Sequence, residues 1–219
     1  MVMCSTTKGH FTINVTSSWA PVGAERFLDL VRDQYYTQVP FFRVVPKFIT
    51  QFGIPLDRDM ILKWRNKGSI QDDPKIFPTF CKGCVSFAGS GPNSRHSQIF
   101  IAYEESTWLG NSPWETPFGQ VIQGLDVLES LKSYGEIPPW GTAPDQGRIA
   151  EEGEPYLKQD YPELDYLQSC EVVADVPVAP EPASGNFVRG HAMLLAMIAM
   201  ACLLIAIISF RLSSRHKTD

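Results

Sequence analysis

Residues 41–53 read FFRVVPKFITQFG, two short runs of aromatic and branched side chains joined by a turn at Pro46-Lys47. Such runs are typical of strands in a sheet. Arg43 and Gln51 interrupt the otherwise apolar pattern. A polar residue on a strand most often faces solvent. The stretch alone therefore leaves two readings open, a solvent-facing pair or a pair that lines a site.

Outward from this stretch, the chain carries many strand signals and few helix signals. Pro21 can open a helix with an apolar face, and residues 125–133 (LDVLESLKS) have helical spacing. The strand signals include a hairpin over residues 1–15 and further runs at 83–87, 98–103, 118–122 and 165–173. Many short strands with only two helices predict a closed β-barrel capped by helices, not α/β layers.

The composition excludes several classes of protein. The chain has 219 residues and a formal net charge of −5, which argues against binding to nucleic acid. No GxSxG, HExxH or phosphate-binding Gly-rich motif is present. The four histidines are scattered without metal-ligand spacing (His10, His96, His191, His216). We therefore expect neither a metal nor a cofactor.

Five cysteines are too few and too scattered for a disulfide framework in a chain this long. We predict reduced thiols at Cys4, Cys170 and Cys202. Cys81 and Cys84 form a C-x-x-C pair, which could be a redox pair or half of a zinc site. No second pair completes a zinc site, and the motif does not open a helix. Two ordinary thiols are the favoured interpretation.

The C-terminal part differs from the rest. Ala192–Phe210 reads AMLLAMIAMACLLIAIISF, 19 residues without a charge. As a helix this stretch would be roughly 28 Å long, close to the ~30 Å hydrocarbon core of a bilayer. The preceding segment is rich in proline, as in an extended spacer. We predict a globular domain (1–173), a Pro-rich linker (174–190), a transmembrane helix (191–211) that meets lipid through residues 192–210, and a short basic tail (212–219).

The side of the membrane is a separate question. The first twenty residues show no apolar signal-peptide core, which predicts a domain facing the cytosol. Arg211, Arg215 and Lys217 follow the span, however, and the positive-inside rule would place that flank in the cytosol. The span length suits the thinner endoplasmic reticulum bilayer. We expect an intracellular, single-pass, tail-anchored protein of that membrane with a cytosolic domain, the luminal orientation staying open.

Two sequence blocks together carry a family resemblance. Residues 41–53 resemble the cyclophilin signature FHRxxxxFxxQGG, and residues 83–101, GCVSFAGSGPNSRHSQIFI, resemble its partner GxxSMANxGPNxxxSQFFI. TWLG at 107–110 and PFGQV at 117–121 follow in the family's order. Residues 143–167 resemble a divergent cyclophilin subgroup. The resemblance implies an eight-stranded antiparallel β-barrel capped by two helices, acting as a peptidyl-prolyl cis-trans isomerase without a cofactor.

The resemblance also implies a set of site residues. Arg43 and Gln51 match the family's catalytic positions. The matching substrate-binding positions are Phe48, Ile49, Ala88, Gly89, Gln98, Phe100, Trp108 and Leu109. Gly89 and Ser90 replace an Asn-Ala pair, and the family's pocket His has no counterpart, with Trp114-Glu115-Thr116 near its place. These departures bear on specificity and rate.

The chemistry of prolyl isomerisation fits these residue types. Rotation about an X-Pro amide faces a barrier of ~18–20 kcal/mol because resonance stiffens the C–N bond. Arg43 could donate to the prolyl nitrogen of the twisted amide and so weaken that resonance. We expect proline-containing polypeptides as clients in protein folding, and weak binding of cyclosporin through Trp108. The rival hypothesis is a catalytically weak module that binds proline peptides and localises a partner at the membrane.

Overall fold

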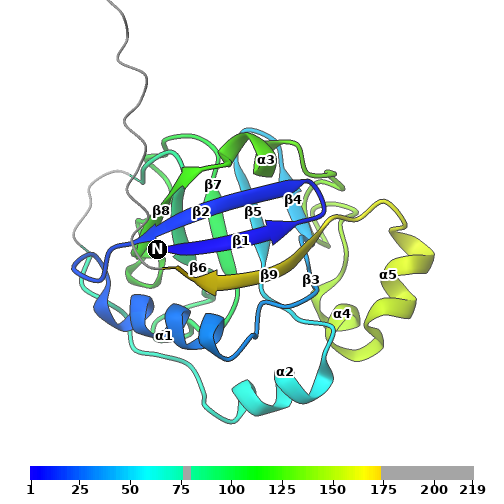
Figure 1. The fold of residues 1–219 in the computed structure, drawn as a ribbon, viewed down its shortest axis with the longest axis horizontal. Coiled ribbons are helices and arrows are strands. Elements are labelled where there is room, and N and C mark those ends of the chain that lie inside the picture. The colour runs from blue at the N-terminus through cyan, green and yellow to red at the C-terminus, as the bar shows by residue number, and fades with distance from the viewer. Residues whose placement is uncertain (76–79, 174–219) are drawn as a thin grey trace, which may run out of the picture. The chain divides into compact units, whose positions relative to one another are not determined.

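The computed structural model describes residues 1–75 and 80–173 (Figure 1). Nine strands in these residues form one antiparallel sheet in the order β3-β9-β1-β2-β8-β6-β7-β5-β4. The strands are β1 Val2–Thr6, β2 Gly9–Val15, β3 Val39–Pro40, β4 Arg43–Val45, β5 Ile49–Phe52, β6 Cys84–Phe87, β7 Ile99–Ala102, β8 Gly119–Gln123 and β9 Tyr166–Val172. The prediction of a mainly β fold is confirmed.

The sheet is curled, and its ladder is not closed in the described residues. Its two end strands, β3 and β4, follow one another in the chain and are separated only by Phe41 and Phe42. Both phenylalanines are buried, Phe41 in the main core and Phe42 in a second cluster with residues of α4 and α5. The predicted closed eight-stranded barrel is therefore wrong in two respects: the ladder is open, and it has nine strands. The ninth strand is the two-residue β3, too short to leave a pattern in the sequence.

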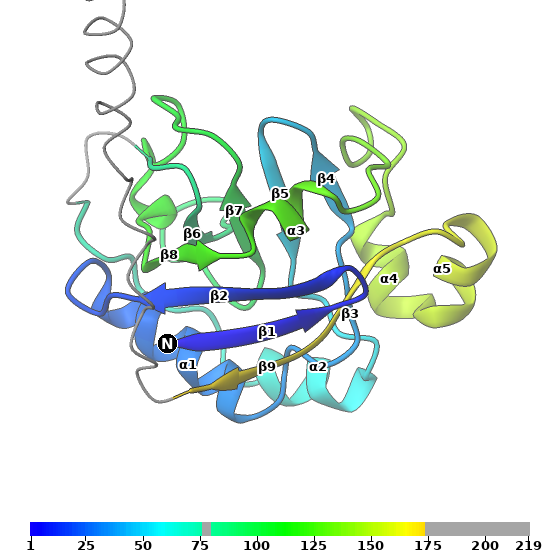
Figure 2. The same ribbon diagram turned by 45° about the horizontal axis from the view of Figure 1, so that its top comes forward.

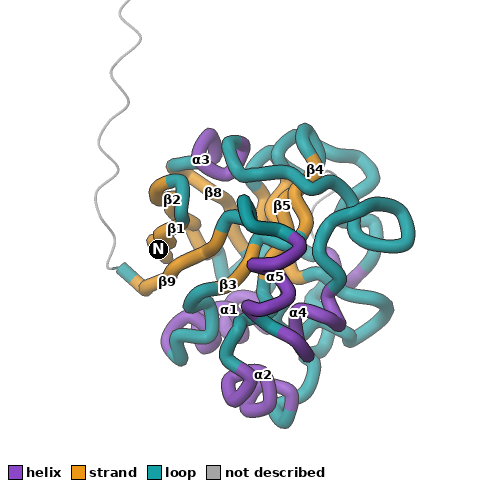
Figure 3. Tube along the Cα trace, turned by 90° about the vertical axis from the view of Figure 1, so that its right-hand side faces the viewer, coloured by secondary structure: helices purple, strands orange, loops and turns teal. Residues whose placement is uncertain are grey.

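The helices also exceed the two that were predicted. The described residues contain α1 Pro21–Arg32, α2 Arg58–Arg65, α3 Leu125–Glu129, α4 Gln146–Glu152, α5 Glu154–Asp160 and the 3₁₀ turn η1 Pro113–Glu115. The side chain of Asp57 caps α2 by accepting from two backbone N–H groups, and Asp145 caps α4. Figures 1 and 2 show α4 and α5 together beside the β3–β4 end of the sheet, and Figure 3 shows α2 on the outside.

A buried ion pair fixes α1 to the loop before β7. Asp73 accepts hydrogen bonds from the backbone N–H groups of Val22 and Gly23, both 2.9 Å long, at the first turn of α1. Its Oδ2 also lies 2.9 Å from Nη1 of Arg95, and both side chains are fully buried. A Cβ at position 23 would lie 2.9 Å from Arg95 Nη1, so Gly23 leaves room for the guanidinium. This pair ties Asp73, in the stretch after α2, to Arg95 within the second sequence block.

The core inside the curled sheet is strongly aromatic. Phe27 of α1 lies 4.8 Å from Phe118 between ring centroids, and Phe118 lies 5.2 Å from Phe87 of β6. Tyr36 and Phe52 extend the cluster toward β5, with centroids 5.7 Å apart. Burying large aromatic side chains dominates core energetics. Strands β5 and β6 are thereby anchored to this core, and β5 also carries residues of the candidate site.

The cysteine prediction is wrong at four positions. Disulfides join Cys4 to Cys170 and Cys81 to Cys84. Cys4 of β1 lies opposite Cys170 of β9 in the strand register, with Cα atoms 4.1 Å apart. A register pairing of residues 166 positions apart leaves no trace in cysteine spacing, so the sequence could not reveal it. Cys202 lies outside the described residues.

The predicted linker, transmembrane helix and basic tail all lie outside the described residues. Within residues 1–75 and 80–173, no helix is long and apolar enough to cross a bilayer. The prediction of a membrane anchor therefore still depends on the sequence of residues 192–210.

Candidate active site

Three neighbouring strands place the key side chains in one row. Arg43 of β4 lies directly opposite Gln51 of β5, and Gln51 lies opposite Phe100 of β7. Directly opposed residues on adjacent strands point to the same face of a sheet. The spacing of eight residues between Arg43 and Gln51 is thus the span of a hairpin whose tight turn lies at Pro46-Lys47. Lys47 has a positive φ of 62° in that turn.

One side of the site, the apolar wall, consists of Phe48, Ile49, Phe100 and Leu109. Ile49 and Phe100 are almost completely buried, with relative exposures of 2% and 4%. Phe80 stacks on Phe100, with ring centroids 5.3 Å apart, and both belong to one cluster with Cys84 and Ala102. The apolar wall therefore has a packed layer behind it and presents a preformed surface for a small apolar ring.

The other side, the polar wall, is a chain of side-chain hydrogen bonds. Arg43 Nη1 donates to Gln51 Oε1 over 3.0 Å, and Gln51 Nε2 donates to Gln98 Oε1 over 2.9 Å. Gln98 Nε2 in turn donates to Gln146 Oε1 of α4 over 2.8 Å. Each glutamine is fixed by its neighbour, so the amides are held in place before any ligand arrives.

A carboxylate completes the polar wall at its other end. Arg43 Nη2 donates to Glu136 Oε2 over 2.7 Å, and Arg43 Nε lies 2.6 Å from Glu136 Oε1. Partial burial would raise the pKa of Glu136, but hydrogen bonds from Arg43 and from the Ile137 N–H outweigh it and lower that pKa. Glu136 is therefore ionised at neutral pH, and the guanidinium faces it as a close ion pair.

The two walls enclose a cavity of about 800 Å³. Nine of the ten predicted site residues line it: Arg43, Phe48, Ile49, Gln51, Ala88, Gly89, Gln98, Phe100 and Leu109. Trp108 lines instead a neighbouring hollow that shares Phe48, and the residue is 80% exposed. The structure thus brings the predicted residues together and sets Trp108 at the rim.

The Trp114 indole packs directly against Gly89. A Cβ built at position 89 would lie 2.7 Å from Cδ1 of the Trp114 indole and 2.9 Å from Ser94 Oγ. The indole, carried by η1, therefore occupies the space that an asparagine side chain would need at position 89. Gly89 is therefore coupled to Trp114, which stands near the expected place of the family's pocket His.

His96 lines the cavity but is not available as a base. Its Nε2 lies 2.9 Å from the Trp64 carbonyl oxygen and its Nδ1 lies 3.1 Å from Ser97 Oγ. Burial lowers the pKa of His96, although the contact with the Trp64 carbonyl works in the opposite direction. The ring is thus neutral at neutral pH, with both nitrogens engaged by the protein.

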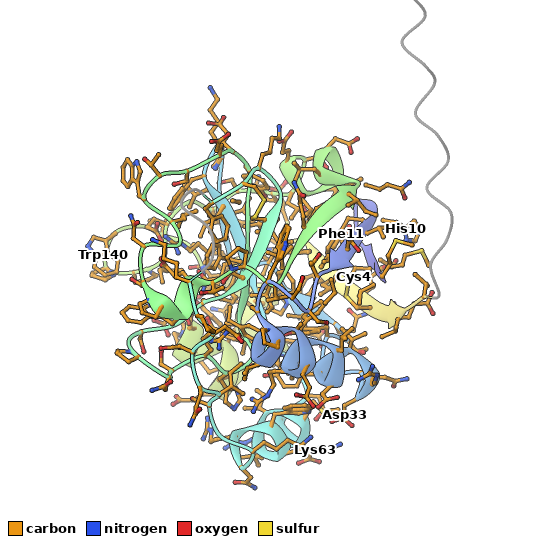
Figure 4. All side chains as sticks on the ribbon, turned by 90° about the vertical axis from the view of Figure 1, so that its left-hand side faces the viewer. Cys4, His10, Phe11, Asp33, Lys63 and Trp140 are labelled. Atoms are coloured by element: carbon orange, nitrogen blue, oxygen red, sulfur yellow. A yellow bond between two sulfur atoms is a disulfide. The ribbon has the colours of Figure 1, made fainter. Side chains whose placement is uncertain are left out.

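Several lining residues were missed in the sequence. Ile137, Trp140 and Gln146 come from the segment between α3 and α4 and from the start of α4. Glu136, next to Ile137, reaches the site through its contact with Arg43. Trp140 is 78% exposed and projects from the surface on the side away from Cys4 (Figure 4). The resemblance of residues 143–167 to a divergent subgroup covered only Gln146 of these residues. It assigned no residue there to the site.

Comparison with known proteins identifies the family. The family model for cyclophilin-type peptidyl-prolyl cis-trans isomerases (Cyclophilin type peptidyl-prolyl cis-trans isomerase/CLD) matches residues 1–150. The chain belongs to the cyclophilin family. Within this cyclophilin domain the family match ends inside α4. The chain beyond it includes α5 and β9, and β9 pairs with β1 on one side and β3 on the other.

Individual relatives agree with this assignment. Peptidyl-prolyl cis-trans isomerase-like 1 of Aspergillus oryzae is 32% identical over 161 residues, covering 70% of this chain and 97% of the relative. Peptidyl-prolyl cis-trans isomerase 10 of Caenorhabditis elegans is 33% identical over 133 residues, covering 60% and 81%.

Solved cyclophilins share the fold at lower identity. A cyclophilin-type isomerase of Cryptosporidium parvum, crystallised in the presence of the dipeptide Ala-Pro, has a TM-score of 0.56 and 21% identity, covering 80% of this chain and 99% of that one. A cyclophilin from Hirschia baltica has a TM-score of 0.55 and 20% identity, covering 82% and 75%.

The cavity offers a ligand the free N–H groups of Arg43. Within the described residues, no group of three or more His, Cys, Asp or Glu side chains could hold a metal ion. What the cavity offers is an apolar wall beside fixed hydrogen-bond donors. Nη1 and Nη2 of Arg43 each use one N–H in the polar wall, which leaves each a second N–H for a ligand.

Proposed function

We propose that this domain catalyses rotation about X-Pro peptide bonds in polypeptide clients and so assists protein folding. The observation that carries the proposal is the Arg43 guanidinium held beside the apolar wall, with N–H groups left over. The proline ring would contact Phe48, Ile49 and Phe100, and the Gln51 amide would bind a backbone group of the client. Family membership and the named relatives support this assignment.

The catalytic step follows from the electronic structure of the amide. As the bond twists, the prolyl nitrogen loses resonance and gains a lone pair. A fixed guanidinium that donates to that lone pair stabilises the twisted state more than either planar form, which is the requirement for catalysis. The donor does not change its protonation during the reaction, since an arginine stays charged.

The test is an isomerisation assay on the purified full-length protein with a proline peptide. Arg43→Ala should lose about 2–4 kcal/mol of transition-state stabilisation, which is roughly a 30- to 1,000-fold fall in kcat/KM. Arg32→Ala is the matched control, because Arg32 is an exposed arginine of α1. Unchanged kcat/KM in a folded Arg43→Ala protein would reject the mechanism. An inactive wild-type protein that still binds the peptide would favour the proline-binding module instead.

We also propose weak binding of cyclosporin. Trp108 is exposed at the rim, where a cyclic peptide could contact its ring. Trp114 over Gly89 changes the shape of the groove next to it. Calorimetry should therefore detect binding that Trp114→Ala strengthens. Affinity that Trp108→Ala leaves unchanged would contradict this part of the proposal.

The membrane anchor is likewise a proposal, supported by the charge-free residues 192–210. We propose a single span in the endoplasmic reticulum membrane. Full-length protein should then resist carbonate extraction, and removal of residues 190–219 should release it. The cytosolic orientation predicts digestion of the domain by protease added to intact vesicles. Protection would establish the luminal side, where the two disulfides would persist more readily.

A further inference from the structure

Glu136 lies outside the two sequence blocks, in the segment that follows α3, yet it contacts Arg43 directly. The chain brings it there by fastening this segment to β4. Ser133 Oγ donates to the Val44 carbonyl over 2.6 Å, and Gly135 forms a β-bridge with Val44. Gly135 precedes Glu136 and Val44 follows Arg43, so this bridge anchors the carboxylate to the strand that carries Arg43.

Hydrogen bonds within the segment also fix its conformation around Glu136. The Ala143 N–H donates to the Glu136 carbonyl over 3.0 Å. A Cβ at position 141 would lie 2.2 Å from that same carbonyl oxygen, so Gly141 permits the close approach. The Ile137 N–H donates to Glu136 Oε1 over 2.9 Å. Backbone and carboxylate are thus both held, and the carboxylate has little freedom to leave Arg43.

The contact with Arg43 fixes the guanidinium along two edges. Glu136 engages Nη2 and faces Nε, while Gln51 engages Nη1. The side chains of Arg43 and Glu136 are only 21% and 28% exposed, so water competes weakly for this pair. A planar group held along two edges has one orientation, and the remaining N–H groups then point in fixed directions.

We propose that Glu136 is a positioning residue that holds the Arg43 guanidinium in its working orientation. Misplacing a catalytic group by a fraction of an ångström can lower a rate strongly, so a fixed orientation has a direct effect on the rate. This inference rests on the proposed role of Arg43. The Glu136 carboxylate also offsets the positive charge of Arg43. Taken by itself, this charge compensation would weaken the action of Arg43 on the twisted amide. Loss of positioning predicts that removal of the carboxylate lowers kcat/KM, whereas loss of charge compensation predicts that it raises kcat/KM.

The first experiment measures isomerisation by full-length Glu136→Ala and Glu136→Gln proteins. Glu136→Ala should lower kcat/KM about tenfold, with the loss in kcat and little change in KM. Glu136→Gln keeps an oxygen that can accept from Nη2, so most of the activity should return. Glu163→Gln is the matched control, because Glu163 is an exposed glutamate paired with Lys132. Unchanged or increased activity in Glu136→Ala overturns the proposal.

A double-mutant cycle separates positioning from a general structural role. If Glu136 acts only through Arg43, adding Glu136→Ala to Arg43→Ala should cause no further loss of kcat/KM. An equal loss in both backgrounds would mean that the segment merely supports the fold, and it overturns the proposal. Thermal melting of each variant checks that it is folded.

A final measurement does not depend on activity. In the wild-type protein the Arg43 guanidinium should give separate N–H signals in NMR, because the two paired edges slow its rotation. Glu136→Ala should merge these signals through faster rotation, and Glu136→Gln should keep them partly resolved. Merged signals already in the wild type overturn the proposal. An inactive wild type with separate signals would refute the proposed function alone.

Discussion

The apolar wall and the polar wall of the cavity are assembled from different parts of the chain. All four residues of the apolar wall lie between positions 48 and 109, within the stretches that carry the family pattern. The polar wall begins with Arg43 and Gln51 in the same stretches but requires Glu136 and Gln146 at its ends. The apolar wall is thus built from the stretches that carry the family pattern, and the polar wall also depends on a segment outside those stretches.

The largest expected effect comes from opening the apolar wall. Phe100→Ala should lower the free energy of unfolding by about 3–5 kcal/mol, because Phe80 loses its stacking partner and a cavity remains. Isomerase activity should fall with it, since the proline ring loses a contact surface. Urea unfolding and the peptide assay measure the two effects. Phe100→Leu should cost less in both, and a loss below 1 kcal/mol for Phe100→Ala would mean that the wall collapses to fill the space.

A smaller effect tests the coupling between Gly89 and Trp114. Gly89→Ala should destabilise the protein by about 1–3 kcal/mol, because the new Cβ overlaps the Trp114 indole. In a Trp114→Ala background the same substitution should be nearly neutral. Chemical unfolding of the four proteins gives the coupling energy directly. Equal costs in both backgrounds would show that Trp114 is not the obstacle.

The polar wall should respond more weakly than the apolar wall. Gln98→Leu removes the middle of the amide chain and leaves Gln51 Nε2 and Gln146 Oε1 without their partners. Because Gln98 is partly exposed, water can replace some of these bonds, and the cost should be about 1 kcal/mol. Gln146→Leu removes only the last hydrogen bond of this series and should lower the free energy of unfolding by less. If Gln146→Leu destabilises the protein more than Gln98→Leu does, the side-chain amides do not fix one another in series.

Much of the fold could be predicted because its signals are local. The alternation in residues 1–15 predicted the β1–β2 hairpin, and Pro21 marked the first residue of α1. The short helices α2 and α4 were missed although Asp57 and Asp145 are ordinary capping residues, since seven or eight residues give too little periodicity. Pairings between distant strands, such as β3 with β9, leave no local pattern at all.

The same distinction applies to the site. The motif stretches named the residues that line the cavity, because strand register fixes Arg43, Gln51 and Phe100 in one row. Glu136 could not be found in this way. Its position depends on the turn from Ser133 to Ala143 and on a bridge to Val44, and neither follows from residue spacing.

The smallest expected effect is a pH dependence of stability that comes from Glu136 at the end of the polar wall. Contact with Arg43 lowers the pKa of Glu136 from its ordinary value of 4.5 in the folded protein. A carboxyl group with a lowered folded-state pKa stabilises the protein fully above the unfolded-state value. It loses that contribution as the pH falls through the folded-state value. Because the pair is partly exposed, the contribution should be under about 1 kcal/mol.

The measurement is urea unfolding of wild type and Glu136→Gln at pH 7, near pH 4.5 and near pH 3. Wild type should be the more stable protein at pH 7, and the difference should shrink toward pH 3 as Glu136 takes up its proton. Glu25→Gln, at an exposed glutamate of α1, is the matched control for the loss of one carboxylate. A constant difference at all three pH values would mean that Glu136 stabilises the polar wall by its shape and hydrogen bonds, and that its charge matters little there.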